Sequence, residues 1–428
     1  MADIEPFKAI RYSRTDLSDL AAPPYDILSQ ADKDALLARN EQNIVSIDLP
    51  HVPPKAAGPD EVYERAAGEL VSWLDTHHLL RDPEPALYAY HQTYRLAGQT
   101  LTRKMFFVRL RLENFGEGRV FPHEQTFGGP KDDRLKLTRA TRCNLSPIFG
   151  LYPDPGNGVA ARLEEDIDRE PDASALLDGV TSSLWVVTDA DTLNAVKQRL
   201  ADLPVYIADG HHRYATALNY RRTLLEETGD EPDPNAPYNY VLAVLSGMED
   251  PGGTIQPYFR TIVDVPQVSA GALQRSLGNA FTLATIERPK NELDLAQRLA
   301  AAGSHAFALY VAQDDTCLTL IPKDPDLLAR YEPDRHPAWR RLPYAVLHRY
   351  VIDEVLTPAR GGAPPIHYHK ALEETITDAH ENAGLAALMP ATTMAELRDV
   401  CAARELMPQK STYFYPKLVT GLVINPLY

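Results

Sequence analysis

The sequence predicts a mixed α/β fold with more than one domain. Apolar runs of strand length alternate with segments of helical periodicity, which is the pattern of sheets covered by helices. The chain has 428 residues, more than a single domain usually holds, and 44% of them are hydrophobic. We therefore expect a larger domain over residues 1–254 and a smaller α/β region over residues 255–428.

The N-terminal part begins with short extended segments and then alternates helices with strands. Pro23 and Pro24 exclude helix at the positions that they occupy, because proline lacks the amide hydrogen. The "AGQ" at 97–99 separates two strand-like runs and predicts a hairpin. The expected helices are 29–40, 59–80 and 190–200, and the expected strands are 86–96, 101–115, 182–189 and 204–209.

A long polar segment interrupts this alternation at residues 121–152. Its first half, "FPHEQTFGGPKDDRLKL", shows little periodicity. Long irregular segments of compact proteins are usually functional or disordered, and the prolines, glycines and aromatic residues here favour an ordered loop. His123 and Glu124 could supply a base, while Lys131 and Arg134 could neutralise phosphate charge. A polar surface loop with solvated charges is the alternative.

The densest polar cluster follows the strand at 204–209. The strand runs directly into Asp209, Gly210, His211, His212 and Arg213, and a helix follows. Glycine lets the chain turn sharply and lets a ligand approach the first amides of the helix, whose dipole favours an anion. Arginine can hold phosphate oxygens through two parallel hydrogen bonds, and histidine can donate hydrogen bonds or transfer protons. The turn therefore predicts a phosphate site, where the aspartate would hold a divalent ion or accept a proton.

Each residue of this turn also has a purely structural explanation. Asp209 could be a helix cap and Gly210 a turn residue, with the histidines exposed at the helix start. The combination favours a site, because helix starts rarely need two histidines and an arginine. Asp26 and Asp48 could be further carboxylates for a metal or a hydroxyl substrate, or equally a turn cap and a loop acid.

The C-terminal region shows a second alternation, which predicts a small α/β layer structure. The expected strands are 260–265, 281–287, 306–312, 316–322 and 384–390, and the expected helices are 270–280, 291–303, 343–356, 370–383 and 393–405. In "IHYHK", His367 and His369 share one side if the segment is extended, as a pair of metal ligands would. No third ligand is near them in the sequence.

Composition and charge argue against several classes of protein. The net charge of −16 makes general nucleic-acid binding unexpected, because such binding needs clustered Lys and Arg. Three widely spaced cysteines fit a reducing compartment and have no metal-ligand spacing. No apolar run approaches the roughly twenty residues of a membrane span, and the first residues have no apolar signal region. We expect a cytoplasmic protein without membrane or nucleic-acid partners.

Several blocks of the sequence resemble one known family. They are "APPYDIL", "FPHEQTFGGPKDDRLKL", "SPIFGLY", "ADGHHRYATAL", "YVLAVLSGMEDPGGTIQPYFR" and "MPQKSTYFYPKLVTGLVI". These blocks look like the shared blocks of the bacterial and archaeal proteins known as domain of unknown function ten-fifteen, described as ParB-like. That family in turn resembles the superfamily of ParB nucleotide-binding domains, sulfiredoxins and the free serine kinase. The resemblance implies a ParB/sulfiredoxin-like domain with a large insertion in the N-terminal part.

Within that superfamily the turn is most similar to that of the free serine kinase, which is also of the Asp-Gly-His-His-Arg kind. Sulfiredoxin carries a reactive cysteine where this chain has His211, so the resemblance does not extend to sulfinic-acid repair. It implies a nucleotide-dependent phosphotransferase acting on a small hydroxyl-bearing metabolite such as a free amino acid. The implied cofactors are Mg²⁺ and a nucleoside di- or triphosphate, ADP, ATP or CTP, and a homodimer is left open.

The chemistry of the turn and of the polar segment assigns a role to each candidate residue. The expected catalytic residues are Asp209, Glu124 and His212, with Asp209 also the metal ligand, and the expected phosphate-binding residues are Gly210, His211, Arg213, Lys131 and Arg134.

Two other functions and one departure from the family remain. The chain could be a non-catalytic nucleotide sensor, or a metal-dependent hydrolase that uses His123, Glu124, Asp209 and His211. In addition, "PYFR" at 257–260 stands where the family has Pro-Thr-His-Arg. If that histidine takes part in the chemistry, this chain lacks it.

Overall fold

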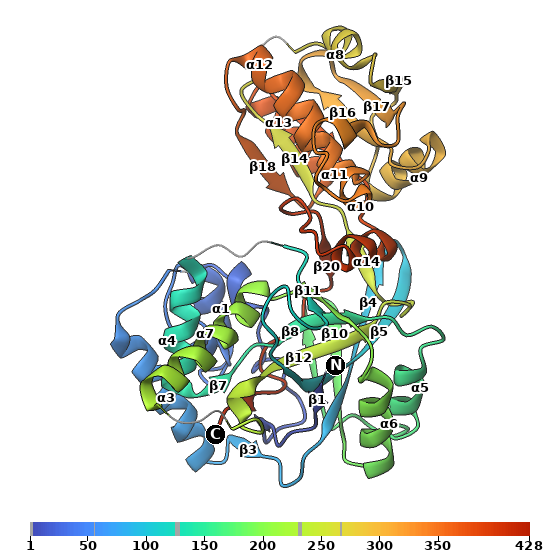
Figure 1. The fold of residues 1–428 in the computed structure, drawn as a ribbon. Helices are drawn as coiled ribbons and strands as arrows, with labels where there is room; N and C mark the ends of the chain where they lie inside the picture. Colours follow the sequence, from blue (N-terminus) through green and yellow to red (C-terminus); the bar gives the residue numbers. More distant parts are fainter. Residues whose placement is uncertain (1–2, 55, 125–128, 230–232, 266–267) are drawn as a thin grey trace. The chain divides into compact units, whose positions relative to one another are not determined.

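The chain divides into two compact units. A computed structural model describes residues 3–54, 56–124, 129–229, 233–265 and 268–428, without the side chains of 129–131. The first unit combines Met1–Thr254 with Pro416–Tyr428, and the second is Ile255–Tyr415 (Figure 1). Residues Pro416–Tyr428, called the closing segment below, were expected with the C-terminal region. They lie in the first unit, where their apolar side chains are buried, among them Leu422 and Ile424.

The first unit is built on a mixed nine-stranded sheet, which confirms the α/β prediction. Its strands in the described chain are β1 (Ile4–Glu5), β4 (Leu87–Leu96), β5 (Gln99–Arg111), β6 (Val120–Phe121), β8 (Ile148–Tyr152), β9 (Ala173–Leu177), β10 (Val180–Val187), β11 (Val205–Asp209) and β12 (Tyr240–Gly247). The order is β6-β11-β8-β12-β5-β4-β10-β9, with β1 beside β5. The β11–β6 and β12–β8 pairs are parallel, and the others are antiparallel.

The predicted hairpin at 97–99 is confirmed. Leu96 pairs with Gln99, and the two residues between them, Ala97 and Gly98, have φ values of 49° and 81°. Two positive φ angles give the turn a twist that matches the right-handed twist of the flanking strands. The strands β4 and β5 are therefore joined by the tightest common hairpin connection.

The helices of the first unit form two groups. They are α1 (Gln30–Arg39), α2 (Val45–Asp48), α3 (Asp60–Asp75), α4 (Gly129–Thr141), α5 (Gly158–Glu164), α6 (Ala190–Leu200) and α7 (His211–Thr228). Helices α3, α4 and α7 pack side by side, and α5 packs against α6 (Figure 1). The apolar residues of α5 and α6 pack on one face of the sheet and share a core with Phe106 and Val108 of β5. The opposite face of β4 and β5 contacts the closing segment through Gln92 and Arg103.

Helix α4 overturns the expectation of an irregular loop in the first half of 121–152. The helix spans Gly129–Thr141, yet its buried face includes Asp133 and Arg134 as well as Leu137. A charged pair can occupy a buried helix face when hydrogen bonds compensate its desolvation. Such a helix lacks the apolar repeat from which a helix is recognised in a sequence.

The second unit contains a six-stranded antiparallel sheet. Its strands are β14 (Phe259–Ile262), β15 (Phe281–Ile286), β16 (Phe307–Val311), β17 (Thr316–Pro322), β18 (Ile366–His369) and β19 (Leu385–Leu388), in the order β15-β17-β16-β19-β14-β18. Its longer α-helices are α8 (Ala270–Leu277), α9 (Glu292–Ala302), α13 (Leu372–Glu381) and α14 (Met394–Ala402). A helical run over 343–360 joins α11 (Pro343–Val346), a π-helical stretch (Leu347–Leu356) and α12 (Thr357–Arg360). One core holds Phe259, Leu299 and Ile376 together.

Short elements complete both units. They are β2 (Ile10–Tyr12) paired with β3 (Leu79–Arg81), β7 (Cys143–Asn144) with β21 (Asn425–Pro426), β13 (Thr254–Gln256) with β20 (Tyr413–Tyr415), and α10 (Pro337–Arg340). The three cysteines are buried and form no disulfide in the described part of the chain. Each described helix is too short or too polar to reach across a lipid bilayer.

Candidate functional site

The turn between β11 and α7 depends on Gly210. Strand β11 ends at Asp209, and its pairing with β8 shifts between Ile207 and Asp209, so a β-bulge precedes the turn. Gly210 has φ 88° and ψ 26°, a left-handed conformation that other residues adopt at a cost. A Cβ atom at this position would also lie 3.0–3.1 Å from the guanidinium of Arg213. The glycine therefore permits both the turn and the close approach of Arg213.

Two cations share the carboxylate of Asp209. The Nζ of Lys417 lies 3.2 Å from Asp209 Oδ2, and NH2 of Arg213 lies 3.4 Å from the same oxygen. Arg213 also donates a hydrogen bond through NH1 to the carbonyl oxygen of Pro147. Two positive side chains therefore contact one carboxylate at the start of α7.

These charges keep Asp209 ionised. Burial by itself raises the pKa of the carboxyl, but the positive charges of Lys417 and Arg213 outweigh burial and hold the pKa of Asp209 well below its usual range. Burial lowers the pKa of the Arg213 guanidinium, but Asp209, Tyr25, Asp26 and Asp48 together outweigh burial and raise it overall. Both groups are charged at neutral pH. Asp209 is consequently a weak base.

His211 and His123 form a buried, neutral pair. The backbone N–H of His123 donates to Nε2 of His211 at 3.2 Å, so this Nε2 carries no proton. The Nδ1 of His123 lies 2.7 Å from the carbonyl oxygen of Ile207 and must be the donor. Burial lowers the pKa of both histidines, and the neighbouring His123 lowers that of His211 further. The pair therefore connects the segment after β6 to the first turn of α7, with His211 as an acceptor.

The other expected residues of the turn are placed as follows. His212 is half-buried at the start of α7, where its carbonyl oxygen accepts a hydrogen bond from Thr216 Oγ1. Glu124 is half-buried and directly follows His123, whose pKa its negative charge raises against the effect of burial. The side chain of Lys131 lies outside the described residues.

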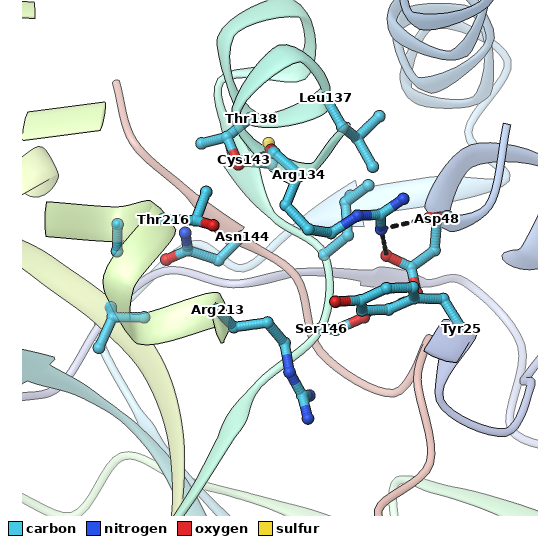
Figure 2. A pocket seen from close by; sticks show the side chains of 13 residues that line it. Tyr25, Asp48, Arg134, Leu137, Thr138, Cys143, Asn144, Ser146, Arg213 and Thr216 are labelled. Carbon is cyan, nitrogen blue, oxygen red and sulfur yellow. Dashed lines mark hydrogen bonds and ion pairs between the residues drawn. The ribbon is translucent and has the colours of Figure 1, made fainter. Parts of the chain in front are cut away.

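A small pocket is lined by residues of both α4 and α7. It has a volume of about 40 Å³, and Figure 2 shows Arg134 and Arg213 extending to it from these two helices. Its polar lining also includes Tyr25, Asp48 and Ser146. The space is sufficient for at least one water molecule. A ligand larger than this pocket would lie partly outside it.

Arg134 is held by two buried carboxylates. Its NH1 donates to the carbonyl oxygen of Asp48 at 2.6 Å and lies 3.3 Å from Asp48 Oδ1, while its Nε donates to Asp133 Oδ2 at 2.7 Å. The guanidinium lies 3.9 Å above the ring of Tyr25. Asp48 also accepts from Ser146 Oγ, and Asp133 from the hydroxyl of Tyr63, both at 2.7 Å. The charge of Arg134 is therefore compensated within the protein.

Arg103 is a further cation of this unit that the sequence did not single out. It is 1% exposed, its NH2 donates to the carbonyl oxygen of Pro416 at 2.6 Å and to Gln92, and its guanidinium lies 4.9 Å from the ring of Phe149. Within the described chain, its Nε and NH1 meet no hydrogen-bond acceptor. Burial lowers the pKa of Arg103, and Asp209 is among the charges that raise it. The sequence did offer one signal for Arg103: it is a charged residue on a strand face that otherwise carries Met105 and Phe107.

Phe259, which stands where the family has histidine, and Arg260, which matches the family's arginine, have packing roles in the second unit. Phe259 is fully buried in the core. Arg260 is fully buried too, and its guanidinium donates to the carbonyl oxygens of Tyr258, Gln409 and Lys410.

Metal-type ligands do not gather at the turn among the residues that the structure describes. Among the described residues, three such ligands lie close enough to share one ion in the second unit: His367, His369 and Asp378. The set His123, Glu124, Asp209 and His211, expected for a metal-dependent hydrolase, is not such a group among the described residues.

Comparison with known proteins gives one family and several distant structures. The family model described as "Protein of unknown function (DUF1015)" matches residues 4–345. No curated protein matches the chain. A free serine kinase in complex with AMP is similar at 15% identity over 71% of this chain and 89% of that chain, with a TM-score of 0.31. SbnI from Staphylococcus aureus, with a C-terminal truncation, is similar at 12% identity over 72% and 84%, with a TM-score of 0.34. Likeness at these TM-scores carries no argument, so any functional conclusion depends on the site itself.

Proposed function

We propose that this chain, which belongs to the DUF1015 family, binds the phosphates of a nucleotide at the Asp209–Arg213 turn and transfers phosphate to a small hydroxyl-bearing metabolite such as a free amino acid. The choice of a nucleotide over free phosphate comes from the resemblance of the turn to the ParB/sulfiredoxin/free serine kinase superfamily. The proposal for the phosphate itself is carried by the geometry of the turn.

The observation that carries the proposal is the sharing of Asp209 by Lys417 and Arg213 at the start of α7. Helix α7 has 18 residues, and its first amides and dipole add to the positive field. A phosphate placed there would face both cations. It would gain charge-assisted hydrogen bonds, which are stronger than neutral ones.

Arg213 retains donors for such a ligand. Its contact with Asp209 at 3.4 Å is longer than the usual 2.7–3.2 Å of an N–H···O hydrogen bond, so this carboxylate restrains it only weakly. A guanidinium has five N–H donors in a planar fork. We expect Arg213 to exchange the long contact for two shorter bonds to phosphate oxygens.

Arg103 supports the same proposal from inside the sheet. Its two buried nitrogens without an acceptor are costly, because each unsatisfied donor keeps its full desolvation penalty. An anionic group of the substrate or the nucleotide that reached Arg103 would remove this penalty.

The catalytic roles follow as parts of the proposal. Mg²⁺ would bind Asp209 together with phosphate oxygens, which must complete the coordination because two cations already contact this carboxylate. The ion would neutralise phosphate charge. Glu124 is the candidate base, since Asp209 is too acidic for that role. His212 is the candidate proton donor, and Lys131 a further phosphate ligand.

A second candidate function is a nucleotide sensor without turnover. It is favoured by the commitment of His123 and His211 to hydrogen bonds within the protein and by the low basicity of Asp209. The two candidates predict the same binding and differ only in turnover.

The test is a thermal-shift screen of the full chain with ADP, ATP, CTP and GTP and Mg²⁺, followed by a turnover assay with free amino acids. A ligand that binds only the folded state raises the melting temperature by mass action. Binding with turnover supports the phosphotransferase, and binding without turnover supports the sensor. If no nucleotide shifts the melting temperature, or if the Arg213→Ala variant shifts like the wild type, the phosphate site is wrong. Arg222→Ala is the matched control, because Arg222 is an exposed arginine of the same helix.

The acidic chain is expected to leave duplex DNA unbound, because −16 net charge repels the phosphate backbone. A gel shift with random duplex at physiological salt checks this expectation. Salt-sensitive retardation at micromolar protein would contradict it.

A further inference from the structure

Three metal-type ligands converge in the second unit. His367 and His369 lie two residues apart on β18, so their side chains leave the same side of the strand. Helix α13 packs against β18 (Figure 1) and contributes Asp378. The Nδ1 of His367 lies 3.0 Å from Asp378 Oδ2, and the Nε2 of His369 lies 2.8 Å from the same oxygen. The ligand atoms of the three residues lie within 4.8 Å of one another.

We propose that His367, His369 and Asp378 bind a divalent transition-metal ion of the zinc type, with an open position for water or an exogenous ligand. Two imidazole nitrogens and one carboxylate oxygen form a donor set typical of zinc sites with three protein ligands. The same set occurs with non-haem iron. Ligands at about 2.0–2.1 Å from a tetrahedral ion lie roughly 3.3 Å apart. The two histidine–carboxylate separations of 2.8 and 3.0 Å are close to this spacing, and the ligand atoms of all three residues lie within 4.8 Å of one another.

The neighbours of these ligands are arranged as metal sites require. The Nδ1 of His369 lies 3.2 Å from Glu374 Oε1, so Glu374 can hold the proton on Nδ1 and direct the Nε2 lone pair toward the ion. The Nδ2 of Asn382 donates to Asp378 Oδ1 at 2.7 Å. This bond satisfies one carboxylate oxygen and orients the other, Oδ2, toward both histidines. Such outer partners fix ligand orientation in known metal sites.

The exposure of one ligand side chain gives the ion a path from solvent and leaves one coordination position accessible. The side chain of His367 is 48% exposed, whereas those of His369 and Asp378 are 12% and 15% exposed. Two ligands are thus held inside the fold, and the third is at the surface. Solvent can supply the remaining coordination position from that side.

The proposal is independent of the nucleotide site, because all five residues belong to the second unit. The competing explanation is an ion-pair cluster, in which the histidines donate protons to Asp378 and attach α13 to the edge strand β18. In that case metal would have no specific affinity for the cluster.

The test uses the full chain, freed of metal with a chelator and titrated with Zn²⁺ by calorimetry and with Co²⁺ by visible absorption. We expect one saturable site per chain and the intense visible bands of low-coordinate cobalt. His369→Ala and Asp378→Asn should each lose at least a hundredfold in affinity. Glu374→Gln should lose about tenfold, as is typical when an outer partner of a ligating histidine is removed.

Two controls keep the result interpretable. His78→Ala removes an exposed histidine of the first unit and should bind metal like the wild type. His211→Ala should also keep the site, whereas a metal site at the β11–α7 turn would lose it. Melting curves without metal identify variants that fail to fold, and Asp378→Asn preserves the shape of the side chain. Absence of saturable binding, or unchanged affinity in folded His369→Ala and Asp378→Asn, would leave the ion-pair cluster as the explanation.

Discussion

Lys417 and Asp209 are 208 positions apart in the sequence, yet the Nζ of one lies 3.2 Å from Oδ2 of the other. The contact places a cation of the closing segment at the turn where β11 meets α7. Through this contact, the closing segment influences the pKa of Asp209.

Lys417→Met should weaken nucleotide binding and raise the pKa of Asp209. A methionine of similar length keeps the packing of the stem but removes the positive charge that lowers this pKa. Loss of one charge-assisted contact corresponds to roughly 1.5–3 kcal/mol, about ten- to a hundredfold in affinity. Calorimetric titration measures the change. Unaltered affinity would mean that Lys417 serves Asp209 alone.

The same variant should change stability on the acid side. Because the pKa of Asp209 is lowered in the folded protein, its ionisation stabilises the fold above the unfolded pKa of about 3.9, and this contribution is lost as pH falls further. The free energy of unfolding of Lys417→Met should be lower near neutral pH and should fall less steeply below about pH 4. Urea melts at several pH values check this difference.

Arg213→Ala should lose about ten- to a hundredfold in nucleotide affinity, for the reason given above for charge-assisted bonds. Arg213→Lys should recover only part of it, because an ammonium keeps the charge and loses the planar fork. The change in melting temperature should be small, since one of the two protein contacts of Arg213 is long. A variant that melts far lower but binds normally would show that Arg213 is a structural residue.

His211 and His123 should make the protein less stable below about pH 6.5. Their pKa values are lowered in the folded state, so the unfolded chain binds more protons once pH falls through its own histidine pKa of about 6.5. Each histidine then removes up to about 1.4 kcal/mol per pH unit until the folded pKa is reached. His211→Gln keeps an acceptor for the N–H of His123 and should make this slope shallower. His78→Gln, which changes an exposed histidine, should leave the slope as it is.

Arg134→Met should destabilise the first unit by about 3–5 kcal/mol, because it leaves Asp48 and Asp133 buried without their cation. Chemical denaturation of the ligand-free protein measures the loss. Lys136→Met, on the same helix but paired at the surface with Asp60, should cost less than about 1 kcal/mol. If Arg134→Met keeps wild-type stability and loses only nucleotide affinity, the phosphate role expected from the sequence is the correct one.

Local sequence patterns were sufficient to predict many helices and strands and the polar turn at Asp209–Arg213. The helix expected at 190–200 is α6. Helix α7 ends at Thr228, and Gly229 follows with a φ of 65°, the left-handed conformation typical of a helix end. Strand, glycine and helix start are all encoded within about ten residues around Asp209, so the turn could be recognised without a fold. Strand β12 is different: all eight of its residues are buried, so it shows no alternation to mark it as a strand.

The tertiary structure decided which distant residues share a site, because contacts across the chain depend on sheet order and helix packing, which no local pattern encodes. It brought His123 to His211 and Lys417 to Asp209, and it placed Asp378 beside the histidine pair that had no third ligand in the sequence. It also formed α4 from a segment without apolar periodicity, since Asp48 and Asp133 compensate the buried charge of Arg134. The sequence alone determined the residue types of the turn and their order, and the fold determined that two cations meet one carboxylate there.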